Sequence, residues 1–114
     1  MEGKEVRELK VSRKALITRA FRRSSVRWRV AEYLFKINPD ASYISEIAYN
    51  IHTTPTNVIG ALRGMGTRYR KEESLVNLNI VEEIDTEGDM KLYRLTDFGK
   101  EVVQMFMKNN DFLP

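Results

Sequence analysis

The stretch SEIAYNIHTTPTNVIGALRGMGTR, residues 45–68, decides the fold. It opens with Ser45, which can cap a helix, and apolar residues then recur at helical spacing up to Ile51. Thr54 and Pro55 start a second helix, because threonine is a good N-cap and proline at the first helical position loses no hydrogen bond. The second helix has its own apolar stripe, made of Val58, Ala61, Leu62 and Met65. The stretch therefore predicts two short helices joined by a tight turn.

Outward from this pair, apolar periodicity and turn residues predict short elements on both sides. Residues 1–10 alternate in charge and are expected to be loosely ordered, so the first helix is expected to begin near Ser12. The elements that follow are a helix over 25–37, an extended piece at 42–44, the helix pair, a helical turn at 74–78, strands at 80–84 and 91–95, and a helix from Thr96. The expected fold class is mainly α with a small β-hairpin.

Length and composition limit the possibilities further. The 114 residues, 42% of them hydrophobic, suit one compact domain with a substantial core. We expect a basic N-terminal extension with a short helix (1–24), a main domain that includes the C-terminal helix (25–108), and a tail (109–114). The chain lacks a long apolar run and an apolar leader, so it predicts a cytoplasmic, nucleoid-associated protein without membrane contact.

Charge is distributed unevenly along the chain. Residues 1–36 hold 11 basic and 4 acidic side chains, residues 37–81 hold 4 of each, and residues 82–114 hold 4 basic and 8 acidic. The densest basic run contains no acid and consists of Lys10, Arg13, Lys14, Arg19, Arg22, Arg23, Arg27 and Arg29. Such a run can attract a polyanion and release its counterions. A solvated helix surface explains it equally well.

The outer face of the second helix of the pair carries small and polar residues. This face consists of Thr56, Asn57, Gly60, Arg63, Gly64 and Thr67. Asparagine can pair with adenine and arginine with guanine, and threonine can contact a base methyl or a phosphate. Glycines add no bulk, so DNA could approach closely there; tight helix packing is the alternative explanation for them. We favour a face that reads DNA.

The predicted hairpin is less typical of a DNA-binding element. Its tip is acidic, with Asp85, Glu87 and Asp89, whereas a tip beside phosphates should be basic. Lys91 and Arg94 on the return strand could still reach the DNA backbone. The acidic tip indicates either a surface that avoids DNA and contacts protein, or an ordinary solvated turn.

Between Val30 and Val103 the chain resembles the winged-helix transcriptional regulators of the broad MarR/ArsR-like class, especially their small archaeal and bacterial forms. The strings that carry the resemblance are YISEIA (43–48), TPTNV (54–58), LNIVE (78–82) and YRLTDFGK (93–100). The resemblance implies a winged helix-turn-helix with extra N- and C-terminal helices, whose recognition helix spans about 55–68. It also implies a left-handed residue at Asn79. The charged connection from Gly64 to Ser74 and the acidic hairpin tip depart from the usual pattern.

Enzymatic and metal chemistry find no support in the sequence. His52 is the single histidine, cysteine is absent, and no carboxylate stands at a recognisable ligand spacing around His52. We therefore expect no catalytic site, no metal and no cofactor. The expected partners are double-stranded DNA and a second copy of the chain, because the terminal helices have more apolar residues than one buried stripe requires.

The resulting prediction is a DNA-binding transcriptional regulator. The residues expected to contact DNA are Thr54, Thr56, Asn57, Gly60, Arg63, Thr67 and Arg68 in the helix pair, Arg22, Arg23 and Arg27 in the basic run, and Lys91 and Arg94 in the hairpin. Two alternatives stay open: a nonspecific architectural DNA-binding protein, favoured by the basic run, and a protein–protein interaction module, favoured by the acidic hairpin tip.

Overall fold

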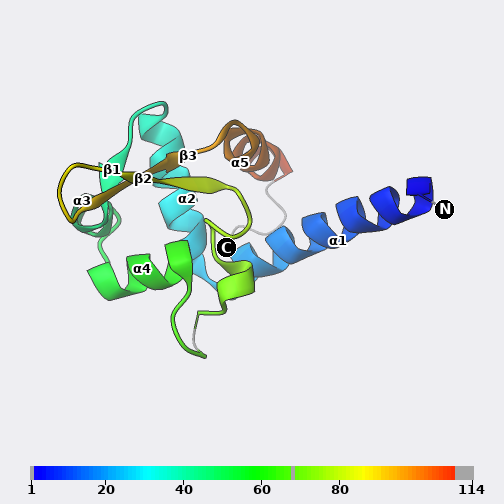
Figure 1. Ribbon diagram of the computed structural model, residues 1–114, viewed down its shortest axis with the longest axis horizontal. Coiled ribbons are helices and arrows are strands. Elements are labelled where there is room, and N and C mark those ends of the chain that lie inside the picture. The colour runs from blue at the N-terminus through cyan, green and yellow to red at the C-terminus, as the bar shows by residue number, and fades with distance from the viewer. Residues whose placement is uncertain (1, 68, 110–114) are drawn as a thin grey trace.

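The fold, taken from a computed structural model, is mainly helical with a small antiparallel sheet (Figure 1). The structure describes residues 2–67 and 69–109, with side chains from residue 13 onward. Its elements are α1 (Glu2–Arg23), α2 (Ser25–Ile37), β1 (Ser42–Tyr43), α3 (Ile44–Asn50), α4 (Pro55–Arg63), the short 3₁₀ helix η1 (Lys71–Glu73), β2 (Val81–Asp85), β3 (Lys91–Leu95) and α5 (Asp97–Asn109). The expected fold class is confirmed at this level.

Helix α2 forms the centre of the molecule. It packs against α1, α3, α4, α5 and β3, and Val30, Ala31 and Leu34 on its inner side are completely buried. Figure 1 shows α2 passing between α4 on one side and α5 on the other. Ser24 caps the start of α2, where its hydroxyl accepts a hydrogen bond from the Arg27 backbone N–H at 3.2 Å.

The sheet has the strand order β1-β3-β2, and both pairings are antiparallel. The hairpin pairs Val81 with Leu95 and Asp85 with Lys91, so β2 lies one residue later than the expected 80–84. Instead of remaining a lone extended piece, residues 42–43 pair with β3 as its second neighbour. Asn79, at φ 61°, has the left-handed conformation that the resemblance implies.

Both helices of residues 45–68 form, but their bounds differ from the expected ones. Helix α3 begins at Ile44 with Tyr43 as its N-cap residue, whose N–H donates to the Glu46 carboxylate at 3.0 Å, so the expected cap at Ser45 is wrong. Helix α4 is shorter than expected. Thr54 caps α4 by accepting from the Asn57 N–H at 3.2 Å. The predicted end at residue 68 is wrong: α4 stops at Arg63, and Gly64 follows at φ 87°, a conformation that disfavours other residues. Met65 and Tyr69 then pair as an isolated bridge, so residues 64–70 form a loop.

The N-terminal segment differs most from the sequence-based expectation. Helix α1 begins at Glu2, because Glu, Lys, Arg and Leu are good helix formers and their alternating charges do not oppose a helix. Its first half projects beyond the rest of the molecule (Figure 1). Its second half contributes Ile17, Ala20 and Phe21 to the core.

The C-terminal helix α5 packs against the second half of α1. Phe106 of α5 packs edge-on against Phe21, with ring centroids 5.3 Å apart, and Phe21 packs likewise against Trp28 at 5.2 Å. Within the described residues, no helix has the length and apolar character needed to cross a membrane. The tail predicted at 109–114 lies, from residue 110 on, outside the described residues.

Candidate functional site

Helix α4 presents one stripe to the surface, in which Thr56 and Arg63 are exposed and Ile59 is half-buried. Its opposite side holds Val58, Ala61 and Leu62, all completely buried. Thr54 and Pro55 at the start of the helix are also exposed. The stripe is therefore rotated from the predicted face: Ile59 belongs to it, and Gly60 does not. Ile59 could have been found from the sequence, since it lies outside the apolar stripe and three residues after Thr56.

Gly60 is covered by the ring of Tyr69. A Cβ placed on Gly60 would lie 2.4 Å from Tyr69 Cδ2, closer than side chains tolerate. The bridge between Met65 and Tyr69 folds the loop back so that this ring reaches α4. The packing explanation therefore applies to Gly60, and the expected close approach of DNA at this residue is wrong.

Asn57 is held by neighbours rather than free on the surface. Its amide nitrogen donates to Thr53 Oγ1 at 3.0 Å, and its amide oxygen accepts from the Tyr69 hydroxyl at 3.4 Å. Both halves of the amide are thus in use. Asn57 connects the turn before α4 to the loop after it, which fixes the position of Tyr69.

Arg63 connects α4 to the hairpin. Its Nε lies 3.5 Å from Glu83 Oε2, while half of the arginine side chain stays exposed. Glu83 also accepts a hydrogen bond of 2.8 Å from the hydroxyl of Tyr93, a buried residue on β3. Burial and the hydrogen bond to Glu83 raise the pKa of Tyr93 to about 12. The carboxylate therefore aligns the arginine side chain at the end of α4.

A groove of about 550 Å³ separates α4 from the hairpin. Its polar lining includes Arg63, Lys71, Ser74, Asn77 and Glu83. Lys71 and Asn77 could not be expected at this site from the sequence, because their segment enters the groove only when the loop after α4 folds back. The N–H groups of Leu75 and Val76 bind the carbonyls of Ala61 and Leu62 at 3.0 and 2.9 Å, which fixes that fold-back.

The basic residues of the hairpin are paired with acids of the same hairpin. Lys91 contacts both Asp85 and Glu83, and Arg94 Nη2 lies 3.1 Å from Glu82 Oε1. The ion pair with Lys91 lowers the pKa of Asp85 and raises that of Lys91. This pairing reduces the positive charge that the hairpin can offer to an anion.

The basic N-terminal run divides into exposed and buried members. Arg22 and Arg23 are exposed, whereas Arg27 is only 2% exposed, so its expected place on the surface is wrong. Glu73 explains the burial: its carboxylate lies 3.5 Å from Arg27 Nη1 and 3.2 Å from Arg23 Nη1. No local pattern indicated Glu73, which is 46 residues from Arg27.

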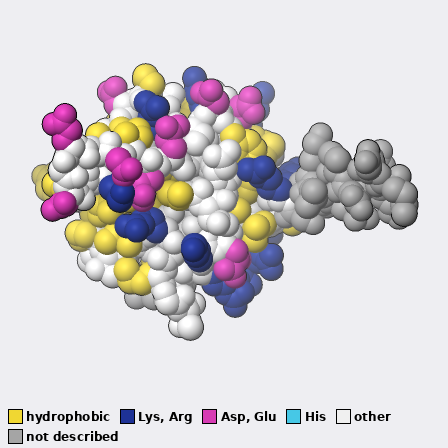
Figure 2. Space-filling view, in the orientation of Figure 1, with side chains coloured by type: hydrophobic (Ala, Val, Ile, Leu, Met, Phe, Trp, Pro, Cys, Tyr) yellow, Lys and Arg dark blue, Asp and Glu magenta, His cyan; other side chains and the backbone are white. Residues whose placement is uncertain are grey.

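Two further expected contacts lie in the loop after α4. Thr67 is exposed there, and Arg68 lies outside the described residues. Figure 2 shows basic side chains gathered at the lower edge, below the junction of α1 with the body, and acidic ones over the upper and left parts. Helix α4 lies in the lower part of the view, as this basic edge does (Figures 1 and 2).

Comparison with known proteins assigns the chain to a family. The model of the EarA-like family matches residues 17–106, which include the second part of α1, the helix pair and the hairpin. An uncharacterized protein of Methanocaldococcus jannaschii is 36% identical over 99 residues, which cover 86% of this chain and 88% of that protein. On the extent of both matches, the chain belongs to the EarA-like family.

Proposed function

We propose that this protein is a DNA-binding transcriptional regulator of the winged helix-turn-helix type, with α4 as its recognition helix. The observation that carries the proposal is the stripe of Thr56, Ile59 and Arg63 on a capped helix whose other side is buried. The order of α2, β1, α3, α4 and the β2–β3 hairpin, with β1 paired to the hairpin, agrees with the resemblance described above.

The stripe offers the chemistry that reading a major groove requires. Arg63 can donate two hydrogen bonds to guanine, and Ile59 can contact a thymine methyl. Thr54 and Thr56, at the first turn of α4, can donate to phosphates, which the helix dipole also attracts there. Asn57 acts in this proposal by orienting Tyr69 and the loop, since its amide is already bonded.

A second copy of the chain belongs to the proposal. An apolar groove of about 330 Å³ runs between α1 and α5, lined by Ile17, Phe98, Val102, Met105 and Phe106 together with Arg13 and Lys14. A two-fold dimer through this groove would present two α4 helices to successive major grooves, about 34 Å apart. Such a protein would prefer palindromic sites.

The test is selection of binding sites from random duplexes, followed by affinity measurements on the selected site. Arg63→Ala is expected to weaken binding by about 1–3 kcal/mol and to relax preference at one base pair. The matched control is Lys36→Ala, which removes the same charge from an exposed position in the last turn of α2. Unchanged affinity and preference in Arg63→Ala would disprove the assignment of the reading stripe.

The same experiment separates the two alternatives. A flat selection profile, with binding that is strong only at low salt, would indicate an architectural protein. No duplex binding even at low salt would indicate an interaction module. The acidic hairpin favours the second alternative, because Glu82, Glu83 and Asp85 neutralise its two basic residues.

A further inference from the structure

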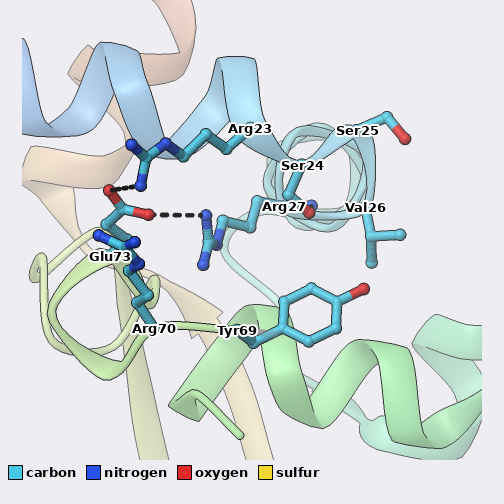
Figure 3. A pocket seen from close by; sticks show the side chains of 8 residues that line it. All are labelled: Arg23, Ser24, Ser25, Val26, Arg27, Tyr69, Arg70 and Glu73. Atoms are coloured by element: carbon cyan, nitrogen blue, oxygen red, sulfur yellow. Dashed lines mark hydrogen bonds and ion pairs between the residues drawn. The ribbon is translucent and has the colours of Figure 1, made fainter. Parts of the chain in front are cut away.

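A polar cavity of about 330 Å³ lies where the end of α1, the start of α2 and residues 69–73 meet. Its lining includes Arg23, Ser24, Ser25, Arg27, Arg70 and Glu73. Figure 3 shows the side chains of Arg23, Arg27 and Arg70 converging around Glu73 from three different segments. Tyr69 forms the side of the cavity nearest to α4.

The cavity has an excess of positive charge. Glu73, almost fully buried, lies 3.4 Å from Arg19 Nε, 3.2 Å from Arg23 Nη1 and 3.5 Å from Arg27 Nη1. A single carboxylate cannot neutralise three guanidinium groups. Arg70 adds a further exposed charge to the lining.

Arg27 has hydrogen-bonding capacity left over. Its Nη1 donates to the Ala20 carbonyl at 3.1 Å and to Glu73, but no acceptor for its buried Nε is present among the described residues. Burial lowers the pKa of Arg27 and the Glu73 carboxylate opposes that shift, so the charge is only partly compensated. A buried, incompletely bonded guanidinium is stabilised by an anion placed beside it.

The residues at the start of α2, Ser24 to Arg27, line the same cavity. The N–H groups of Ser25 and Val26 come before the first hydrogen bond of the helix, which runs from Trp28 to the Ser24 carbonyl at 3.4 Å. The positive end of the helix dipole lies there, and the first turn contains no acidic residue. Arginines and a helix N-terminus therefore surround one cavity.

We propose that this cavity binds a phosphate group, held by Arg23, Arg70 and the N-terminus of α2, with Arg27 behind it. Two sources share this chemistry: a phosphodiester of bound duplex DNA and a free phosphate or phosphate ester. The DNA source rests on the proposed function. It is supported by Tyr69, whose ring lies between the cavity and Gly60 of the recognition helix.

The first arm of the test uses inorganic phosphate and no DNA. Phosphate is titrated into the isotope-labelled protein at constant ionic strength, with chloride as the reference anion, and the N–H resonances of Ser25, Val26 and the Arg27 side chain are followed. Saturable shifts specific to phosphate are expected. They should disappear in Arg70→Ala and persist in Arg22→Ala, which removes an exposed arginine outside the lining. Circular dichroism checks that both variants fold.

The second arm uses the duplex selected for the protein. If the phosphate belongs to DNA, Arg70→Ala weakens binding for all sequences alike and makes the slope of log affinity against log salt less steep by about one. If it belongs to a free ligand, Arg70→Ala leaves duplex affinity unchanged, although the unsubstituted protein still gives a positive phosphate titration.

The two proposals fail separately. A positive phosphate titration in a protein that binds no duplex disproves the regulator and retains the cavity, with a free phosphate as its ligand. The cavity is disproved as a phosphate site by two results together: Arg70→Ala binds the duplex with unchanged affinity and salt slope, and the unsubstituted protein shows no saturable phosphate shift. Those two results leave the regulator standing.

Discussion

Glu83 connects the surface stripe of α4 to the hairpin. It lies within ion-pair distance of Arg63 and Lys91 and accepts the Tyr93 hydroxyl. Such a carboxylate fixes the arginine side chain, which lowers the entropy lost when the arginine binds a base. In the proposed complex it would also place a negative charge close to DNA phosphates. The two effects oppose each other in DNA binding.

The repulsive effect is expected to be the larger one, because Arg63 remains half exposed and solvent weakens its ion pair with Glu83. Glu83→Gln should therefore raise duplex affinity about two- to fivefold, a change of up to ~1 kcal/mol that suits a partly exposed ion pair. Fluorescence anisotropy on the selected duplex measures it. Glu82→Gln, which frees Arg94 instead, is the matched control. Equal or weaker binding in Glu83→Gln would show that alignment of Arg63 matters more.

A second prediction for a single residue concerns Gly60 and tests how the loop after α4 packs on that helix. Gly60→Ala should reduce the free energy of unfolding by about 1–3 kcal/mol, because the new methyl group overlaps the Tyr69 ring. Chemical denaturation measures the loss. Gly88→Ala is the control, since no described atom lies within 4 Å of a Cβ added there. In a Tyr69→Ala background the loss at Gly60 should largely vanish; a full loss in that background would contradict the packing role.

Among the elements, α4 shows where sequence reasoning succeeds and where it stops. Its start was predictable, since Thr54 and Pro55 act through local hydrogen bonding and local geometry. Its end was not, because the last carbonyls are bound by Leu75 and Val76, more than ten residues further along. The inner stripe was predictable in the same way, whereas the cover over Gly60 depends on a bridge between Met65 and Tyr69. Periodicity identifies the side of a helix that faces the core and not the loop that covers another side.

The junction of the hairpin with α5 yields a prediction at the scale of elements. The Thr96 hydroxyl accepts from the Gly99 N–H at 2.8 Å and lies within hydrogen-bonding distance of the Asn79 and Ile80 carbonyls. It caps α5 and ties that helix to the entry of β2. Thr96→Ala should therefore cost about 1–2 kcal/mol of unfolding free energy. Thr67→Ala, on the exposed loop, should cost far less. Similar losses in the two variants would contradict the cap.

For the whole molecule, Tyr93 predicts how stability responds to alkaline pH. Its pKa is about 12 in the folded protein against 10.0 for the free group. The unfolded chain therefore loses this proton first. Stability from this group is complete below pH 10 and is lost as pH rises from 10 to 12, by up to about 2.7 kcal/mol. Between pH 10 and 12, the unfolding free energy obtained from denaturation curves should fall less steeply with pH in Tyr93→Phe than in the unsubstituted protein. An identical pH dependence in the two proteins would contradict this assignment.

The groove between α1 and α5 leads to the last prediction, which is that two copies of the chain form a dimer through it. Met105 is 37% exposed and lies in the groove beside Phe98 and Phe106, so a dimer through this surface would bury it. Met105→Asp places a charge there, and desolvating that charge opposes association. Light scattering should give twice 13.3 kDa for the unsubstituted protein at micromolar concentration and 13.3 kDa for Met105→Asp.

Measurements of DNA binding separate the effect of Met105→Asp on dimerisation from any effect on recognition of the DNA sequence. Met105→Asp should bind a single half-site as well as the unsubstituted protein does, because α4 is unchanged, and should lose the added affinity of a palindrome. Gln104→Asp adds the same charge to the neighbouring exposed residue, which lies outside the α1–α5 groove, and should remain dimeric. A single-chain mass for the unsubstituted protein would disprove the dimer. A Met105→Asp protein that stays dimeric would instead place the interface on another surface.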